Sequence, residues 1–257
     1  MNKFFINIRI AFKVLRDLKN WPEYFLDYFC LLKEKFLIYE LKNGLKFKAR
    51  RGASDRGIVG DICLLEVYPL TKYYMPRNPI FIDLGAHIGV FSIFSVFKKN
   101  ATVYAYEPFP DNFDLLLENI KLNKMENKIF PFNLAVSDLK NCRLYIAEEN
   151  TGGHSIIIKS KKSIVVNSVS LEDIFYRNRI YRCDLLKLDI EGSEYSVLYN
   201  APNEILKKID KIYLECHDIK TRPGYNYREL KRFLEKNRFK VILESSPLYM
   251  YLYAIRF

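Results

Sequence analysis

The chain has 257 residues, a formal net charge of +11 and a hydrophobic fraction of 49%. This length suits one large domain with a sizeable core, and ten glycines and ten prolines are too few for a collagen-like or low-complexity chain. The five cysteines include no Cys-x-x-Cys pair, which argues against a disulfide framework or a zinc ribbon and favours a reducing cytoplasm. Charged residues from Arg9 onward interrupt the N-terminal apolar stretch, so we expect no signal peptide.

The basic excess is concentrated at the start of the chain. Residues 1–60 hold 13 Lys and Arg against 6 Asp and Glu, whereas residues 61–257 hold 28 against 24. We therefore expect two functional parts, a basic N-terminal extension over residues 1–70 and a larger domain over residues 71–257.

Helical spacing of apolar residues predicts a helix over residues 3–19, with a basic second face. Two interpretations stay open: an ordinary helix packed on its own domain, or peripheral contact of residues 1–20 with a membrane surface or a partner. Residues 36–50 form a predicted β-hairpin, with Asn43-Gly44 in a two-residue turn.

From about residue 78, short apolar runs alternate with stretches of helical periodicity. This order predicts an α/β fold with a mostly parallel, doubly wound sheet, and two final apolar runs without a helix between them predict an antiparallel edge hairpin. The predicted strands are 80–84, 102–106, 129–133, 184–189, 210–215, 239–243 and 250–256, and the predicted helices are 88–97, 111–121, 193–199 and 226–237. The segment 141–170 interrupts this order, and we expect it to be an insertion near a site.

The stretch from Ile80 to Phe97 is apolar enough to resemble a membrane span, but its glycines favour a strand, a turn and a helix. Gly85 and Gly89 let the backbone approach a ligand beside the helix N-terminus. Glu107 ends the next predicted strand 18 positions after Gly89, close to the ~20-residue offset at which a carboxylate binds ribose hydroxyls. Together they predict an adenosine-type ligand, and His87 in place of a glycine disfavours a nicotinamide cofactor.

Two pairs of acid–base residues follow later strands: Asp189 with Glu191, and Glu215 with His217. The carboxyl ends of neighbouring parallel strands meet at one edge of a sheet, so we expect these four candidate catalytic residues to face one pocket. A hydroxyl that accepts a methyl group must lose its proton, and a carboxylate or an imidazole in this pocket could take it. Alternatives stay open, because the first pair could cap the following helix and the second could be a structural ion pair. No compact ligand motif supports a metal, and we predict none. His154 is either an acceptor-site residue or a solvated loop residue.

Four stretches of the sequence resemble the FkbM-type S-adenosylmethionine-dependent methyltransferases, over roughly residues 78–240. They are Asp83–Gly89, Tyr106–Pro108, Ala135–Asp138 and Lys187–Glu194. The resemblance implies a Rossmann-like class I methyltransferase fold for residues 71–257 and S-adenosylmethionine as the cofactor.

The resemblance also implies roles for single residues. Gly85 and Gly89 would line the methionine end of the cofactor, with Asp83 orienting its amino group. Glu107 would hold the ribose hydroxyls, and Ser137 with Asp138 would lie at the adenine edge. The full implied cofactor set is Asp83, Gly85, Ala86, His87, Gly89, Glu107, Ser137, Asp138 and Asp189.

The activity that the resemblance implies is O-methylation of a hydroxyl of a sugar, of a glycolipid or polysaccharide, or of a secondary metabolite. We expect a cytoplasmic enzyme, and peripheral contact with the inner membrane surface stays open. One alternative is a nucleic-acid methyltransferase, suggested by the net charge. It is disfavoured because Asp189 and Glu191 stand where base-methylating enzymes carry an Asn/Asp-Pro-Pro-aromatic tetrapeptide, and two carboxylates repel phosphates. The other is a non-catalytic cofactor-binding module at a membrane surface.

Overall fold

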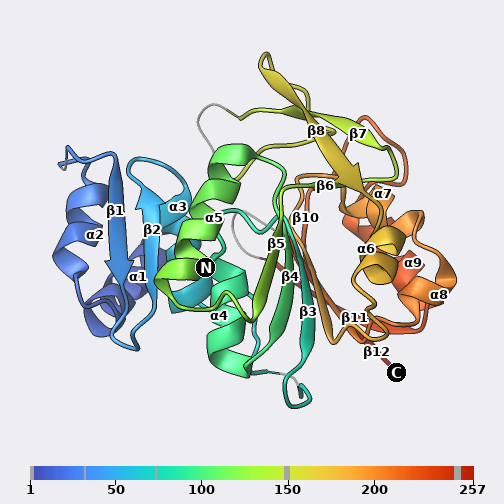
Figure 1. Ribbon diagram of the computed structural model, residues 1–257, viewed down its shortest axis with the longest axis horizontal. Helices are drawn as coiled ribbons and strands as arrows, with labels where there is room; N and C mark the ends of the chain where they lie inside the picture. Colours follow the sequence, from blue (N-terminus) through green and yellow to red (C-terminus); the bar gives the residue numbers. More distant parts are fainter. Residues whose placement is uncertain (1–2, 32, 73, 148–150, 246–249) are drawn as a thin grey trace.

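We describe a computed structural model of the chain, over residues 3–31, 33–72, 74–147, 151–245 and 250–257 (Figure 1). Its centre is a seven-stranded sheet in the order β11-β12-β10-β9-β3-β4-β5. The strands are β3 (Ile80–Leu84), β4 (Thr102–Tyr106), β5 (Ile129–Phe132), β9 (Leu185–Leu188), β10 (Lys211–Cys216), β11 (Phe239–Ser245) and β12 (Met250–Arg256). β12 runs antiparallel to both β10 and β11, and the other pairings are parallel. The predicted doubly wound sheet with an antiparallel edge hairpin is confirmed.

Helices cover both faces of this sheet, as Figure 1 shows. One face carries α4 (Val90–Lys99) and α5 (Pro110–Leu122), and the other carries α6 (Leu171–Arg177), α7 (Glu194–Tyr199), α8 (Asn203–Leu206) and α9 (Tyr227–Lys236). Each face has its own apolar core, because residues such as Phe91 of α4 and Leu230 of α9 present buried stripes to opposite sides of the strands. Among the described residues, none of the helices combines the length and apolarity needed to cross a bilayer.

The direction of strand order reverses between β3 and β9. The chain moves from β3 through β4 to β5 on one side, whereas β9 and β10 lie on the other side. Ligands of such sheets bind outside the carboxyl ends of the strands at this reversal. A ligand is therefore expected to bind at the loops after β3 and β9.

The N-terminal part packs against the face that carries α4 and α5. It consists of α1 (Lys3–Asp17), α2 (Trp21–Tyr28), β1 (Phe36–Glu40), β2 (Lys46–Arg50), α3 (Asp55–Val59) and a π-helical turn (Gly60–Leu64). Val14, Leu18 and Phe47 are fully buried in the same apolar core as Phe91. Residues of the basic extension and of the larger domain therefore share one continuous core.

Asparagines of α5 complete the hydrogen bonding of strand β2. Asn119 accepts the N–H of Lys48 at 2.6 Å and donates to its carbonyl at 3.0 Å, and Asn123 makes the same pair of bonds to Lys46. These side chains take the place of a neighbouring strand and cover an edge that would otherwise be unpaired. These four hydrogen bonds fix the position of the hairpin along α5.

The turn of the hairpin differs from the two-residue turn predicted for Asn43-Gly44. The N–H of Leu41 donates to the carbonyl of Leu45 at 2.8 Å, so three residues form the loop. Of these three, only Gly44 has a positive φ, of 95°. This geometry corresponds to a type I turn followed by a left-handed glycine, and the side chain of Asn43 accepts the N–H of Leu45 at 3.1 Å.

The segment 141–170 contains strands, as expected of an insertion. β7 (Asn141–Tyr145) and β8 (Ser163–Val169) form a hairpin, and β6 (Ala135–Val136) joins it in a small sheet of order β6-β8-β7. In Figure 1 this sheet lies above the carboxyl ends of the central strands. The insertion therefore stands next to the reversal point.

Candidate active site

The loops after β3 and β9 touch each other at a glycine. Gly85 has φ of 77°, and a Cβ atom there would lie 1.9 Å from the carbonyl oxygen of Asp189. Gly89 has φ of 87°, and a Cβ atom there would lie 2.5 Å from a methyl carbon of Leu116 in α5. Both positions need a left-handed backbone and the absence of a side chain, so other residues would push the two loops or α5 apart.

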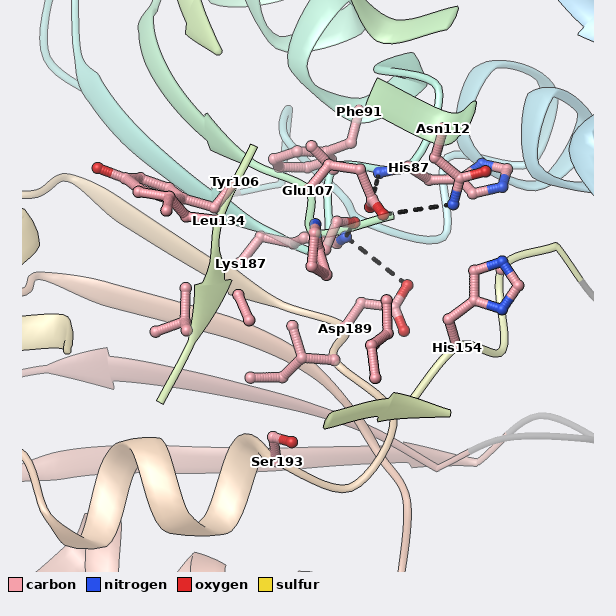
Figure 2. Close-up of a pocket in the computed structure, with 18 of the residues that line it drawn as sticks. His87, Phe91, Tyr106, Glu107, Asn112, Leu134, His154, Lys187, Asp189 and Ser193 are labelled. Carbon is pink, nitrogen blue, oxygen red and sulfur yellow. Dashed lines mark hydrogen bonds and ion pairs between the residues drawn. The ribbon is translucent and has the colours of Figure 1, made fainter. Parts of the chain in front are cut away.

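A pocket opens at this contact, which we call the first pocket (Figure 2). It contains about 800 Å³ of unfilled space, part of which is open to solvent. Its lining comes from the loops after β3, β4 and β9, from strands β6 and β9, from α5 and from the insertion. It includes Gly85, Ala86, His87, Glu107, Asn112, Leu134, Ala135, Val136, His154, Lys187, Asp189 and Ser193.

Glu107, which directly follows β4, lies buried in the wall of the first pocket. Its carboxylate accepts the N–H groups of His87 at 2.8 Å and Phe109 at 2.9 Å, and the amide of Asn112 at 3.3 Å. Burial raises the pKa of Glu107 to about 6 despite these donors. A carboxylate has about four acceptor positions, so one remains for a hydroxyl of a ligand.

The N-terminal part supplies a second layer of polar groups to this wall. Arg50, at the end of β2, donates to Asp55 Oδ1 at 3.0 Å and to Asn112 Oδ1 at 2.6 Å. Its Nη2 atom lies 3.3 Å from Nε2 of His87, whose pKa burial lowers to about 4, so the ring is neutral. The sequence analysis missed Arg50 and Asp55, because no local pattern indicates a contact between segments this far apart in the chain.

His154 lies in the wall of the first pocket rather than in solvent. Its ring packs on Phe109 with a centroid distance of 4.1 Å, and burial lowers its pKa to about 4. Nδ1 accepts the N–H of Ala147 at 3.1 Å, so the neutral ring carries its hydrogen on Nε2. Within the described part of the chain this buried Nε2 has no partner. It is a donor without an acceptor at the edge of a pocket.

Lys187 lies on β9, at the start of one of the four stretches that resemble the family, and the resemblance implies no role for it. Its buried ammonium donates to the carbonyl of Gly85 at 2.7 Å and lies 3.2 Å from Asp83 and 3.7 Å from Asp189. Burial alone lowers its pKa, but the carboxylates outweigh this effect and raise it, so the group stays charged. Figure 2 shows Lys187 pointing toward Asp189. A lysine in a fully buried strand is the signal that could have found it, since such a charge needs partners.

A second pocket adjoins the first at Asp189. It encloses about 850 Å³ of unfilled space, and it shares Ile58, Ile62, Gly152 and Asp189 with the first pocket. The remaining wall comes from α3, the π-helical turn and the segment after it, the loop after β9, and strands β10 and β12. Its residues include Arg56, Asp61, Tyr68, Glu191, Glu215 and Tyr251. Two ligands could therefore meet at Asp189.

His217 is the centre of an ion-pair cluster behind the second pocket. Its Nδ1 lies 3.0 Å from Glu194, and its Nε2 lies 3.1 Å from Glu215 and 3.5 Å from Glu191. Burial by itself lowers the pKa of His217, but the three carboxylates outweigh it and raise the pKa to about 12. The ring is therefore an imidazolium at neutral pH and cannot accept a proton, which favours the structural ion pair among the alternatives for Glu215 and His217.

Glu191 differs from its neighbours in this cluster. Its carboxylate lies in the wall of the second pocket, and burial raises its pKa to about 7. Ligand atoms of Asp189, Glu215 and His217 lie within 4.8 Å of one another, a spacing that a cation could use. Because the imidazolium of His217 already supplies positive charge there, we assign no metal to these groups.

Four of the residues expected to contact the cofactor, Asp83, Gly89, Ser137 and Asp138, are not part of the lining of the first pocket. Asp83 is fully buried and accepts the hydroxyl of Ser92 at 2.6 Å besides pairing with Lys187. After β6 the chain turns toward β8, so Ser137 bonds to strand β8 and the exposed Asp138 pairs with Asn200 instead of facing the pocket. Leu134, Ala135 and Val136, just before them, line it instead.

The chain matches one protein-family model and is similar to several known proteins. A family model described as the methyltransferase FkbM domain matches residues 83–241. The chain is 25% identical to the 31-O-demethyl-FK506 methyltransferase FkbM of Streptomyces tacrolimicus, over 68% of this chain and 77% of that protein. It is 24% identical to the hexuronic acid methyltransferase AglP of Haloferax volcanii, over 55% of this chain and 57% of that protein. A solved structure of M. jannaschii TYW2 in complex with AdoMet covers 88% of this chain and 89% of that one, at 18% identity and a TM-score of 0.44.

Removal of the buried ammonium should destabilise the fold. Lys187→Met leaves the fully buried carboxylate of Asp83 without its cation, and we expect the free energy of unfolding to fall by about 3–5 kcal/mol. Urea denaturation measures this loss. Lys140→Met, at an exposed position, is the matched control and should change stability by less than about 0.5 kcal/mol. Equal effects of the two variants would contradict the role given to Lys187.

Proposed function

Since the chain belongs to the FkbM methyltransferase family, we propose that it transfers a methyl group from S-adenosylmethionine to a hydroxyl of a sugar or a similarly small polyhydroxylated acceptor. The observation that carries this proposal is the junction of the two pockets at Asp189. Two relatives, a hexuronic acid methyltransferase and a 31-O-demethyl-FK506 methyltransferase, support an acceptor of this class. The carboxylates around the second pocket disfavour nucleic acid, because they repel phosphates.

The first pocket has the donor and acceptor groups that the cofactor needs. Glu107 has acceptor capacity for ribose hydroxyls, and Nε2–H of His154 is a buried donor that a ring nitrogen or oxygen of the cofactor would satisfy. The Gly85–Ala86 backbone lines the part near Asp189, where the methionine end would lie. The cofactor supplies an electrophilic methyl group. Asp83 would act on this end through Lys187, since Lys187 pairs with Asp83 and itself lines the pocket.

The second pocket would align the acceptor and remove its proton. Methyl transfer is an in-line displacement, so most of the catalytic effect comes from holding the hydroxyl at the junction and excluding water. Asp189 would orient the hydroxyl there, and the carboxylate of Glu191 would take its proton, because a base is most effective when its pKa lies near the working pH. The imidazolium of His217 would hold Glu191 and Glu215 in place without exchanging a proton itself.

Loss of the base should lower the rate and change its pH dependence. Glu191→Gln is expected to reduce kcat by roughly 10²–10⁴-fold, with little effect on cofactor affinity. In the native enzyme the rate should rise with pH through about 7, because Glu191 must be deprotonated to act as the base. The variant should lack this rise. Transfer of labelled methyl groups to a pooled glycan fraction measures both effects.

The matched comparison for this prediction is Asp189→Asn. This variant should also lose activity but keep the rise near pH 7, because Glu191 is intact. Full turnover by both variants would show that the reacting hydroxyl lies elsewhere, and an unchanged pH profile in Glu191→Gln would remove Glu191 as the base.

His154 provides a test of the cofactor site that needs no acceptor. His154→Phe keeps the ring packing on Phe109 but removes the Nε2–H donor. Because one hydrogen bond contributes about 1 kcal/mol, we expect S-adenosylmethionine to bind roughly five-fold more weakly in calorimetry. Unchanged affinity in a stably folded variant would place His154 outside the cofactor contacts.

We further propose a cytoplasmic location with peripheral contact of the N-terminal helices at the inner membrane surface. All five cysteines are free, which fits a reducing compartment. Phe12, Leu15 and Trp21 are exposed apolar side chains in the most basic part of the chain. The intact chain should therefore sediment with vesicles rich in anionic phosphatidylglycerol and less with purely zwitterionic ones. The triple change of these residues to Ser should abolish sedimentation, and equal binding by both proteins would end this proposal.

A further inference from the structure

The charge of the second pocket restricts the acceptor, an inference that rests on the proposed function. Four carboxylates line this pocket: Asp61 from the π-helical turn, Asp189 and Glu191 after β9, and Glu215 on β10. Arg56 is the one cationic side chain among the described residues of its lining. A wall with this balance attracts positive charge and repels negative charge.

The cations near the second pocket are already committed to other groups. Nη1 of Arg56 lies 3.0 Å from the fully buried carboxylate of Asp27, and its guanidinium lies over the ring of Tyr28 at 5.0 Å. His217 also forms an ion pair with Glu194, and Lys187 forms one with Asp83. The side chains of Glu194 and Asp83 have no exposed surface. These cations therefore only partly offset the carboxylates that face the cavity.

Asp61 shows the uncompensated charge most clearly. Its partly buried carboxylate faces the cavity, and among the described residues it has no hydrogen-bond or ion-pair partner. Burial alone raises its pKa to about 6. Desolvating a carboxylate without a partner is unfavourable for the fold, and groups of this kind are concentrated where a ligand binds.

The side chain of Tyr251 lies in the lining of the second pocket next to Glu215. The two residues lie directly across the strand pair from each other. Burial raises the pKa of Tyr251, and the charges of Glu215, Asp61 and Asp189 raise it further. Asp61, Asp189, Glu191 and Glu215 thus line one cavity together with Tyr251, so one ligand in that cavity would face all four carboxylates.

We infer that the acceptor carries an ammonium group, as an amino sugar does, which binds at Asp61 and Glu215 while the hydroxyl to be methylated lies at Asp189 and Glu191. Even if the sulfonium of the bound cofactor offsets Asp189, three carboxylates remain on the acceptor side. A neutral sugar would leave Asp61 desolvated and unpaired. An acceptor with a carboxylate or a phosphate beside the hydroxyl would meet like charges, which selects against it.

Three matched probes test this inference by binding alone. The 4-nitrophenyl glycosides of glucosamine, glucose and glucuronic acid differ mainly in charge, and each is titrated into the full chain with S-adenosylhomocysteine at neutral pH. We expect the glucosaminide to bind at least ten-fold more tightly than the glucoside and the glucuronide more weakly than both. Asp61→Asn should remove most of this preference, whereas Asp114→Asn, at an exposed position on α5, should keep it. Similar affinities for all three probes, or tighter binding of the glucuronide, would overturn the inference.

A second measurement needs no ligand. Asp61 must ionise in a partly desolvated place, so its charge destabilises the fold as the pH rises through about 6. Asp61→Asn should therefore raise Tm at pH 8, and this gain should shrink at pH 5, where Asp61 is protonated. A lower Tm at pH 8 would reveal a stabilising partner for Asp61 and overturn the inference.

The outcomes separate the inference from the proposed function. If the chain prefers the glucosaminide but transfers no methyl group to any part of a pooled glycan fraction, the proposed function fails and the charge preference stands. If methyl groups appear on neutral or acidic glycans separated by ion exchange, the function stands and the inference is wrong.

Discussion

The ammonium of Lys187 joins the two loops between which the pockets meet. It bonds to the carbonyl of Gly85 after β3 and lies beside Asp189 after β9, and its charge is balanced by the buried Asp83. The same two loops are in direct backbone contact, which only a glycine at position 85 permits. Steric fit therefore sets the distance between the loops, and the buried charge sets their orientation. A parallel sheet supplies the frame, because it brings the ends of β3 and β9 side by side.

The N-terminal extension is part of the site rather than an appendage. Arg50 and Asp55 form the outer layer of the first pocket, while α3 and the π-helical turn form one wall of the second. The insertion is tied to the same places, since Thr151 donates to Asp55 at 2.9 Å and Ser155 donates to the carbonyl of Glu191 at 2.5 Å. Both segments thus converge on the junction where the acceptor is proposed to bind. Variation in them would change the acceptor without moving the sheet.

The electrostatics of the site divide into two zones with different tasks. Around the first pocket, buried histidines are kept neutral, so His87 and His154 act as hydrogen-bonding groups rather than charges. Around the second pocket, His217 is kept charged by three carboxylates, and Glu191 is left with a pKa of about 7. The difference follows from neighbours rather than from burial, because all three histidine side chains are largely shielded from water. In the proposed function, this difference would separate cofactor recognition from proton transfer.

The order of strands and helices, and the loops that carry Gly85, Glu107 and Asp189, could be predicted from the sequence alone. Hydrophobic periodicity is a local property, and the carboxyl ends of parallel strands gather at one edge in any doubly wound sheet. The charge of His217 and the position of Asp61 in one cavity with Asp189, Glu191 and Glu215 could not be predicted in this way. These features depend on how segments distant in the chain pack together and on the burial this produces, and neither leaves a periodic trace in the sequence.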